Sequence, residues 1–149
     1  MLRFLLGPVG AEPSVTTLRE PIQAVGLSTR TTARTVFRDV PRLLARYLER
    51  KKQHGIPDLR EPWAFLAMSD RFDAATMSWD YTAGDAVTRH DAVPEGMVSF
   101  EMPAGTYAVF PVRPRLRFLL GWAIARTKRF AIEEWFPGSE YEPTGADFE

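Results

Sequence analysis

The segment Trp79-Asp80-Tyr81-Thr82-Ala83-Gly84-Asp85-Ala86-Val87 carries the clearest secondary-structure pattern in the chain. Its aromatic residues Trp79 and Tyr81 alternate with polar residues, which is the period of a β-strand that is buried on one face. We therefore predict a strand from Met77 to Val87. Because glycine lacks a β-carbon, Gly84 within this strand indicates a bulge or a close approach of another backbone.

Strand-like runs lie on both sides of this segment. Trp63 to Met68 is a compact apolar run, too short for a typical helix and suited to a buried strand. Val98–Met102 and Thr106–Phe110 are two further strand-like runs. Val15 to Leu27 predicts a strand that is interrupted at Pro21, since proline has no N–H to donate to a ladder.

Two polar segments complete the strand and loop predictions. Ser28 to Thr35 is rich in Ser, Thr and Arg, and we expect a loop there. The tail contains Glu140–Glu142 and Asp147–Glu149, separated by Pro143-Thr144-Gly145. These two runs offer material for two short strands.

Two helices are predicted, near Asp39–Gln53 and Pro114–Phe136. Asp39 suits an N-cap, and Pro41 would then fall in the first turn, where a missing N–H is tolerated. Pro137 and the glycine after it end the second helix. The first helix carries apolar residues at helical spacing: Val40, Leu43, Leu44, Tyr47 and Leu48.

The predicted elements form an approximate repeat. Each half runs strand, break, strand, helix, strand, strand, which places the chain in the α+β class. The length of 149 residues fits one domain, so we predict a single domain over residues 1–149 with halves at approximately 13–93 and 94–149. A seam between two such halves is a natural place for a cleft.

Composition excludes several functions. Lys plus Arg and Asp plus Glu both number 19, so no bulk charge attracts nucleic acid, and we predict no direct nucleic-acid binding. The face formed by Arg42, Arg46 and Arg50 is interpreted as a solvated helix surface. There are no cysteines, and the two histidines have no spaced ligand partners, so no metal site is expected. No phosphate-binding glycine loop is present, and we predict no cofactor.

The N-terminal run Met1–Pro8 is too short for a secretory signal, because Gly7 and Pro8 interrupt it. No stretch approaches the roughly 18 apolar residues of a membrane span. We therefore predict a cytoplasmic protein with no membrane partner.

Short motifs in a fixed order resemble those of the GyrI-like effector-binding family, and the resemblance covers most of the chain from about Pro21 onward. They are Trp79–Val87, Pro94-Glu95-Gly96, Pro103–Phe110, Glu134–Ser139, Tyr141-Glu142 and Asp147–Glu149. The resemblance implies a duplicated strand–helix–strand–strand fold, with a curved antiparallel sheet of about eight strands and two main helices. Relatives are the ligand domains of AraC-type and MerR-type multidrug regulators, and this chain is similar to the stand-alone bacterial members.

The resemblance also implies a ligand site. Relatives bind lipophilic, often cationic molecules in a central pocket, against aromatic walls and a glutamate that matches Glu149 here. Read from the residues alone, Glu149 is also consistent with a solvated terminal side chain, and the aromatic residues with core packing. Alternation shows which residues share a face but not which face lines the pocket. The candidate ligand residues are Glu149, Trp79, Tyr81, Tyr107, Trp63 and Trp122.

Three functions remain open on this scaffold. The first is sensing or sequestering a lipophilic, cationic small molecule in a pocket between the halves. The second is hydrolysis of reactive cyclopropane-type compounds, for which Glu149 would be the catalytic residue. The third is binding to a protein partner such as a regulator or DNA gyrase, as the family's namesake does. One carboxylate in a pocket serves as a counter-ion or as a general base, so the sequence does not separate these alternatives.

Overall fold

The computed structural model describes residues 12–114 and 116–149, which form two compact units. The α2 unit comprises residues 19–104 and 145–149, and the α3 unit comprises residues 12–18 and 105–144. Segments of the two units therefore alternate along the chain. The apolar run Met1–Pro8, which bears on targeting, lies outside the described residues.

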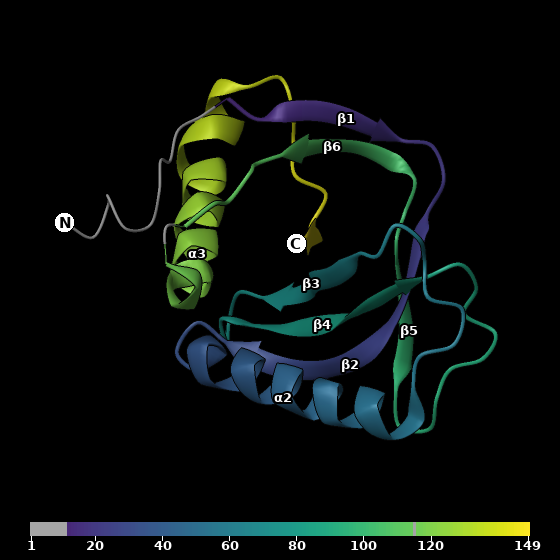
Figure 1. Ribbon diagram of the computed structural model, residues 1–149. Helices are drawn as coiled ribbons and strands as arrows, with labels where there is room; N and C mark the ends of the chain where they lie inside the picture. Colours follow the sequence, from purple (N-terminus) through teal and green to yellow (C-terminus); the bar gives the residue numbers. More distant parts are fainter. Residues whose placement is uncertain (1–11, 115) are drawn as a thin grey trace. The chain divides into compact units, whose positions relative to one another are not determined.

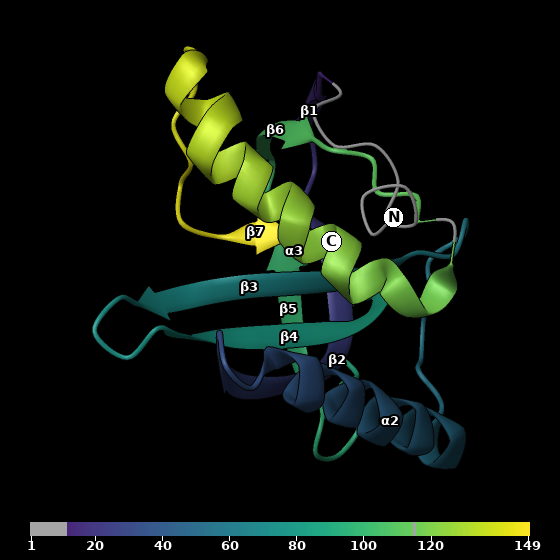
Figure 2. The same ribbon diagram turned by 90° about the vertical axis from the view of Figure 1, so that its left-hand side faces the viewer.

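The α2 unit is built on a five-stranded antiparallel sheet with the strand order β5-β2-β4-β3-β7. Helix α2 packs along one face of this sheet (Figure 1), and the β3–β4 hairpin is seen most clearly in Figure 2. The bounds are β2 Ile22–Thr32, α2 Val36–His54, β3 Phe65–Asp73, β4 Ser78–Val87, β5 Val98–Met102 and β7 Asp147–Phe148.

Strand β2 is longer than the sequence analysis expects. The predicted loop Ser28–Thr35 is wrong over residues 28–32, which pair with β4 as far as the partners Thr32 and Ser78. Ser and Thr side chains suit a half-buried sheet when a partner strand is present, and the long strand β4 supplies that partner. Thr31 is fully buried here, and its hydroxyl donates to Oδ2 of Asp39 at 3.0 Å.

Helix α2 begins three residues before the predicted start. Thr35 is its N-cap residue, and the Thr35 carbonyl accepts from the N–H groups of Arg38 and Asp39 at 2.9 Å. Asp39 therefore lies in the first turn and not at the cap, and hydrogen bonds from Thr35 and other neighbours lower the pKa of its carboxyl group. Pro41 lies inside the helix. The predicted apolar stripe is confirmed for Leu43 and Tyr47, which are buried, and for Val40 and Leu44, which pack against the core. It is wrong for Leu48, which is exposed.

Two apolar clusters lie on opposite faces of the sheet. On the α2 face, Leu43 and Tyr47 pack with odd-numbered residues of β2, β3 and β4, including Tyr81. The other face carries a smaller cluster built on Ala24, Leu66 and Phe100. Successive residues along a regular strand therefore point in turn to the α2 face and to the opposite face.

The central strands approach each other closely at two glycines. Gly26 and Gly84 are direct partners in the β2–β4 register. A β-carbon on Gly84 would overlap the carbonyl oxygen of Val25, and one on Gly26 would overlap the carbonyl oxygen of Ala83. The close backbone approach predicted at Gly84 is thus confirmed.

The α3 unit contains a two-stranded antiparallel ladder, β1 Ser14–Leu18 with β6 Gly105–Val109. The predicted helix Pro114–Phe136 is replaced by four consecutive helical segments. They are η1 Arg117–Leu119, α3 Leu120–Phe130, the π-helical η2 Ala131–Trp135 and the 3₁₀ segment η3 Phe136–Gly138. An aromatic cluster packs around Trp135, whose ring stacks on that of Tyr141 at 5.9 Å.

The described residues contain seven strands, one fewer than predicted, in two antiparallel sheets with two main helices. The missing strand is Glu140–Glu142. The Ser139 hydroxyl donates to the Phe136 carbonyl at 3.0 Å and accepts from the Tyr141 N–H at 3.2 Å. Together with the Trp135–Tyr141 stack, these bonds fold the segment back on the end of the helix and away from a strand conformation.

Candidate functional site

Glu149 is held in place by strand pairing beside β3. Its N–H donates to the carbonyl of Ala67 at 2.8 Å, and its carbonyl accepts from the N–H of Ala67 at 2.9 Å. Opposite residues in a ladder point to the same face, so the Glu149 side chain lies on the α2 face of the sheet. There the hydroxyl of Tyr81 donates to Oε2 of Glu149 at 3.4 Å.

Tyr81 lies at the centre of β4 and is 7% exposed. Burial raises the pKa of its phenol above the ordinary value of 10.0, and the negative charges of Glu149 and Asp147 raise it further. The phenol therefore keeps its proton at neutral pH and donates a hydrogen bond to the carboxylate. The result is an exposed carboxylate held by a buried phenol, and such a negatively charged group can attract a cation.

The raised pKa predicts a loss of stability in alkali that depends on Tyr81. The unfolded chain releases the phenolic proton near pH 10, before the folded protein does. This contribution to the free energy of unfolding is full below pH 10 and declines as the pH rises further. Urea unfolding at pH 9, 10 and 11 should therefore show a shallower decline in Tyr81→Phe than in the wild type. Equal slopes in the two proteins would contradict the assignment.

Trp79 lies on the same face of β4 as Tyr81, two residues nearer the β3–β4 turn. It is half-buried, and its ring lies 6.5 Å from that of Phe72 across the hairpin. Asp73 shapes the turn by accepting hydrogen bonds from the N–H of Ala75 at 2.9 Å and the hydroxyl of Thr76 at 2.8 Å. The structure thus brings Trp79, Tyr81 and Glu149 onto one face.

Trp63 belongs to a network around a buried carboxylate, that of Asp85. The Trp63 indole Nε1 donates to Oδ1 of Asp85 at 2.8 Å, and the Tyr47 hydroxyl donates to Oδ2 at 2.7 Å. Lys51 forms an ion pair with the same Oδ2. Asp85 is completely buried, so these donors replace the water that the carboxylate loses on folding.

Asp85, Tyr47 and Lys51 are not among the site residues predicted from the sequence. The alternation in β4 could have indicated that Asp85 is buried. Asp85 occupies the position at which Tyr81 and Ala83 predict an inward-facing apolar residue. An acidic residue at such a position requires buried donors, so a polar network could have been expected there.

The other two candidate residues lie in the α3 unit. Tyr107 is a half-buried residue of β6, opposite Thr16 in the ladder, and burial raises the pKa of its phenol. Trp122 lies on α3 and is 55% exposed. Their roles as ligand residues remain predictions.

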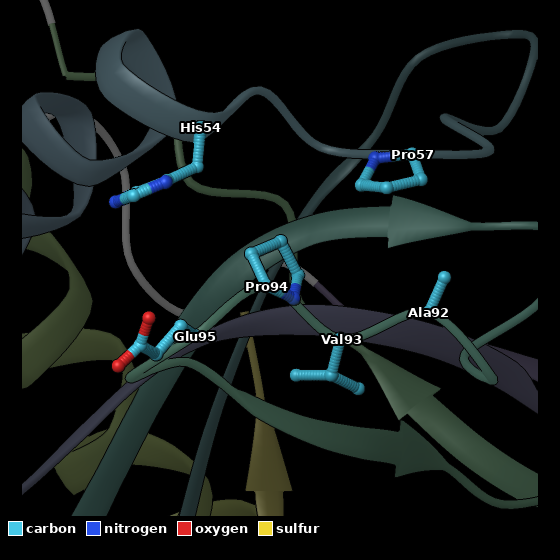
Figure 3. Close-up of a pocket in the computed structure, with 6 residues that line it drawn as sticks. All are labelled: His54, Pro57, Ala92, Val93, Pro94 and Glu95. Carbon is cyan, nitrogen blue, oxygen red and sulfur yellow. The ribbon is translucent and has the colours of Figure 1, made fainter.

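The α2 unit has surface hollows on and beside helix α2, and the two described here are not lined by any predicted ligand residue. One, of about 460 Å³, lies over Arg46, Glu49, Arg50 and Gln53 on α2. The other, of about 330 Å³, lies between the end of α2 and the loop before β5 and is shown in Figure 3. Its walls are His54, Pro57, Ala92, Val93, Pro94 and Glu95.

The described parts of the chain show no cluster of three or more His, Asp or Glu side chains that could hold a metal ion. Over the same residues, every helix is too short or too polar to serve as a transmembrane segment.

A family model described as Cass2, integron-associated effector binding protein, matches residues 17–149. The match covers nearly the whole chain, including both helices and Glu149. The chain belongs to the Cass2 family. This membership confirms the resemblance to GyrI-like effector-binding domains.

A solved structure supports the fold of this Cass2 protein. It is that of an integron cassette protein from the mobile metagenome of Vibrio cholerae, with a TM-score of 0.59 and 15% sequence identity. The similarity covers 93% of this chain and 87% of the other chain. No curated protein matches the Cass2 chain.

Proposed function

We propose that this protein is a small-molecule binding domain that senses or sequesters a lipophilic organic cation. Members of the Cass2 family are described as effector binding proteins, and this description supports a small-molecule ligand. The observation that carries the choice of a cation is the Tyr81–Glu149 pair, with its 3.4 Å hydrogen bond on the α2 face.

The proposed roles follow from the chemistry of these groups. Glu149 supplies the counter-charge for the cation, and Tyr81 orients the Glu149 carboxylate. The Tyr81 ring is buried in the core cluster, so Tyr81 acts on a cation only through the exposed carboxylate of Glu149. Trp79, on the same face, adds apolar surface. Contacts from Tyr107 and Trp122 remain part of the predicted ligand set.

Glu149→Gln tests the charge assignment, because it keeps the shape of the side chain and removes its charge. We expect an alkyl quaternary ammonium ion to bind the variant about tenfold more weakly than the wild type, a change of about 1.4 kcal/mol. A neutral analogue of the same shape should bind both proteins equally. Isothermal titration measures both affinities.

Glu101→Gln is the matched control, since Glu101 is an exposed residue of β5 in the same unit. This variant should bind the cation like the wild type. Equal binding of the cation by the wild type and Glu149→Gln would refute the role of Glu149.

The hydrolase alternative predicts a different outcome from the same titrations. A hydrolase would convert a strained electrophilic ligand, and Glu149→Gln would still bind it but leave it unaltered. Mass spectrometry of the ligand after incubation with each protein separates binding from turnover.

A further inference from the structure

Helix α2 carries an excess of positive charge, although the chain as a whole is neutral. Six residues of the helix are basic and two are acidic. Two of the basic residues are compensated within the fold, because Arg38 pairs with Asp39 at 3.1 Å and Lys51 pairs with Asp85. The excess is therefore concentrated on the other basic residues of the helix, which are Arg42, Arg46, Arg50 and Lys52.

Arg42, Arg46 and Arg50 form a row along one side of α2. Neighbours in this arginine row are four residues apart in sequence, which places them about 6 Å apart along the helix axis. Arg42 and Arg46 are exposed, and neither forms an ion pair with any residue that the structure describes. Both guanidinium groups are thus available to carboxylates of a partner, which arginine binds through paired hydrogen bonds.

Arg50, at the end of the row, is held in a fixed position. Its Nη1 donates to the carbonyl of Glu95 at 3.1 Å. Gly96 lies so close to this guanidinium that a β-carbon on Gly96 would be 2.6 Å from Nη1. The loop before β5 therefore orients Arg50. A guanidinium that is already ordered loses less entropy when it binds a partner.

The larger of the two surface hollows, of about 460 Å³, lies on this row. It is lined by Arg46, Glu49, Arg50 and Gln53, which share one face of the helix. The two guanidinium groups outnumber the single carboxylate of Glu49, so the hollow favours an entering group with a negative charge. The Gln53 amide offers a further hydrogen-bond donor to such a group.

The second hollow, of about 330 Å³, begins one helical turn further along α2. Its lining residue His54 follows Arg50 by four residues, and Glu95 contributes to this hollow while its carbonyl accepts from Arg50. Figure 3 shows the apolar side chains of the hollow, which are those of Pro57, Ala92, Val93 and Pro94. These walls suit an aliphatic side chain of a partner, and such an anchor contributes more affinity than exposed charges do.

We infer that the arginine row and the two hollows form a docking surface for an acidic segment of a partner protein. The segment presents carboxylates to the row and, next to them, an aliphatic side chain to the hollow beside Val93. Duplex DNA fits less well, because the exposed carboxylates of Glu49 and Glu95 lie beside the row and would face its phosphates. A protein segment can place neutral or basic side chains opposite them. The inference does not rest on the proposed cation site.

Two synthetic peptides test the inference by fluorescence anisotropy. One is an alanine-based helix with glutamate at every fourth position and a leucine four residues beyond the last glutamate. The other has glutamine in place of each glutamate. The wild type should bind the glutamate peptide about tenfold more tightly, and raising the sodium chloride concentration should reduce this preference. Equal binding of the two peptides would refute the inference.

Two variants of the larger hollow should act in opposite directions. Arg46→Gln should weaken the binding of the glutamate peptide about threefold, because it removes one charge pair. Glu49→Gln should strengthen binding, because it removes the negative charge from the same hollow. Arg19→Gln is the matched control, since Arg19 is exposed, lies outside α2 and loses the same charge. It should bind like the wild type. An equal loss in Arg19→Gln and Arg46→Gln would mean general attraction and no docking surface.

Val93→Ser tests the apolar part of the surface. Replacing the leucine of the glutamate peptide by alanine should weaken its binding to the wild type about threefold. The same replacement should make little difference in Val93→Ser, because this variant has lost part of the apolar wall. An equal effect in both proteins would contradict the position assigned to the aliphatic side chain.

A duplex oligonucleotide, titrated at the same salt concentration, separates the two kinds of acidic partner. It should bind the wild type more weakly than the glutamate peptide does. Tighter binding of the duplex that is lost in Arg46→Gln would assign this face to nucleic acid and overturn the inference.

Discussion

Gly84→Ala should lower the free energy of unfolding by at least about 3 kcal/mol, a value at the upper end of the effects of overpacking. The added methyl group would overlap the carbonyl oxygen of Val25, a backbone atom that cannot rotate away. The strands β2 and β4 would have to separate at Gly26, in the middle of the sheet. Urea unfolding monitored by circular dichroism measures the change.

Gly138→Ala is the control for this substitution. A β-carbon at Gly138 meets no atom within 4 Å, so this variant should unfold within about 0.5 kcal/mol of the wild type. If both glycine variants were equally stable, the close approach of β2 and β4 would be refuted.

Leu43→Ala should also be strongly destabilising, by about 3 kcal/mol. Leu43 is 1% exposed and packs with Val25, Leu27 and Tyr47 in the cluster between α2 and the sheet. Removing its side chain loses the transfer free energy of the buried methyl groups and leaves a cavity beneath the helix. The same urea unfolding experiment gives the value.

Leu48→Ala on the same helix provides a matched comparison. Leu48 is 62% exposed, so its truncation should change the free energy of unfolding by no more than about 0.5 kcal/mol. A similar loss in both variants would mean that the face of α2 is wrongly assigned.

Alternation was sufficient to locate the centre of the sheet. The predicted strand Met77–Val87 is observed as Ser78–Val87, and Val98–Met102 is observed with the same bounds. Apolar and polar residues alternate in these segments because one face of each strand contacts the core, and this alternation is visible in the sequence. The buried stripe of α2 was predictable for the same reason, except that Leu48 is exposed.

Elements that depend on a partner were not predictable. Residues 28–32 extend β2 only because β4 runs beside them, and a polar composition cannot reveal that partner. The tail at Glu140–Glu142 is turned by Ser139 and by the stack of Tyr141 on Trp135. Both contacts join side chains whose proximity arises from the fold.

In the candidate site, too, single residues were predictable but the contacts between them were not. The resemblance to a family pointed to Glu149 and Tyr81 as single residues, but not to the bond between them. That bond requires the register in which Glu149 pairs with Ala67, and these positions are far apart in the chain. The Asp85 network likewise joins α2, β4 and the segment before β3. Of its members, only Asp85 could be suspected from the sequence, because it is an acidic residue at an inward-facing position.

Strand β7 is translated long after the strand β3 with which it pairs. The ribosome releases β2, α2, β3, β4 and β5 before β6, α3 and β7, and these earlier elements can assemble while the chain is still growing. Residues 145–149 can join them only after residues 105–144 have been translated. A nascent chain thus acquires its sheet before it acquires the carboxylate of Glu149. A cationic ligand that depends on this carboxylate would therefore stabilise the finished protein and could not assist the folding of the emerging one.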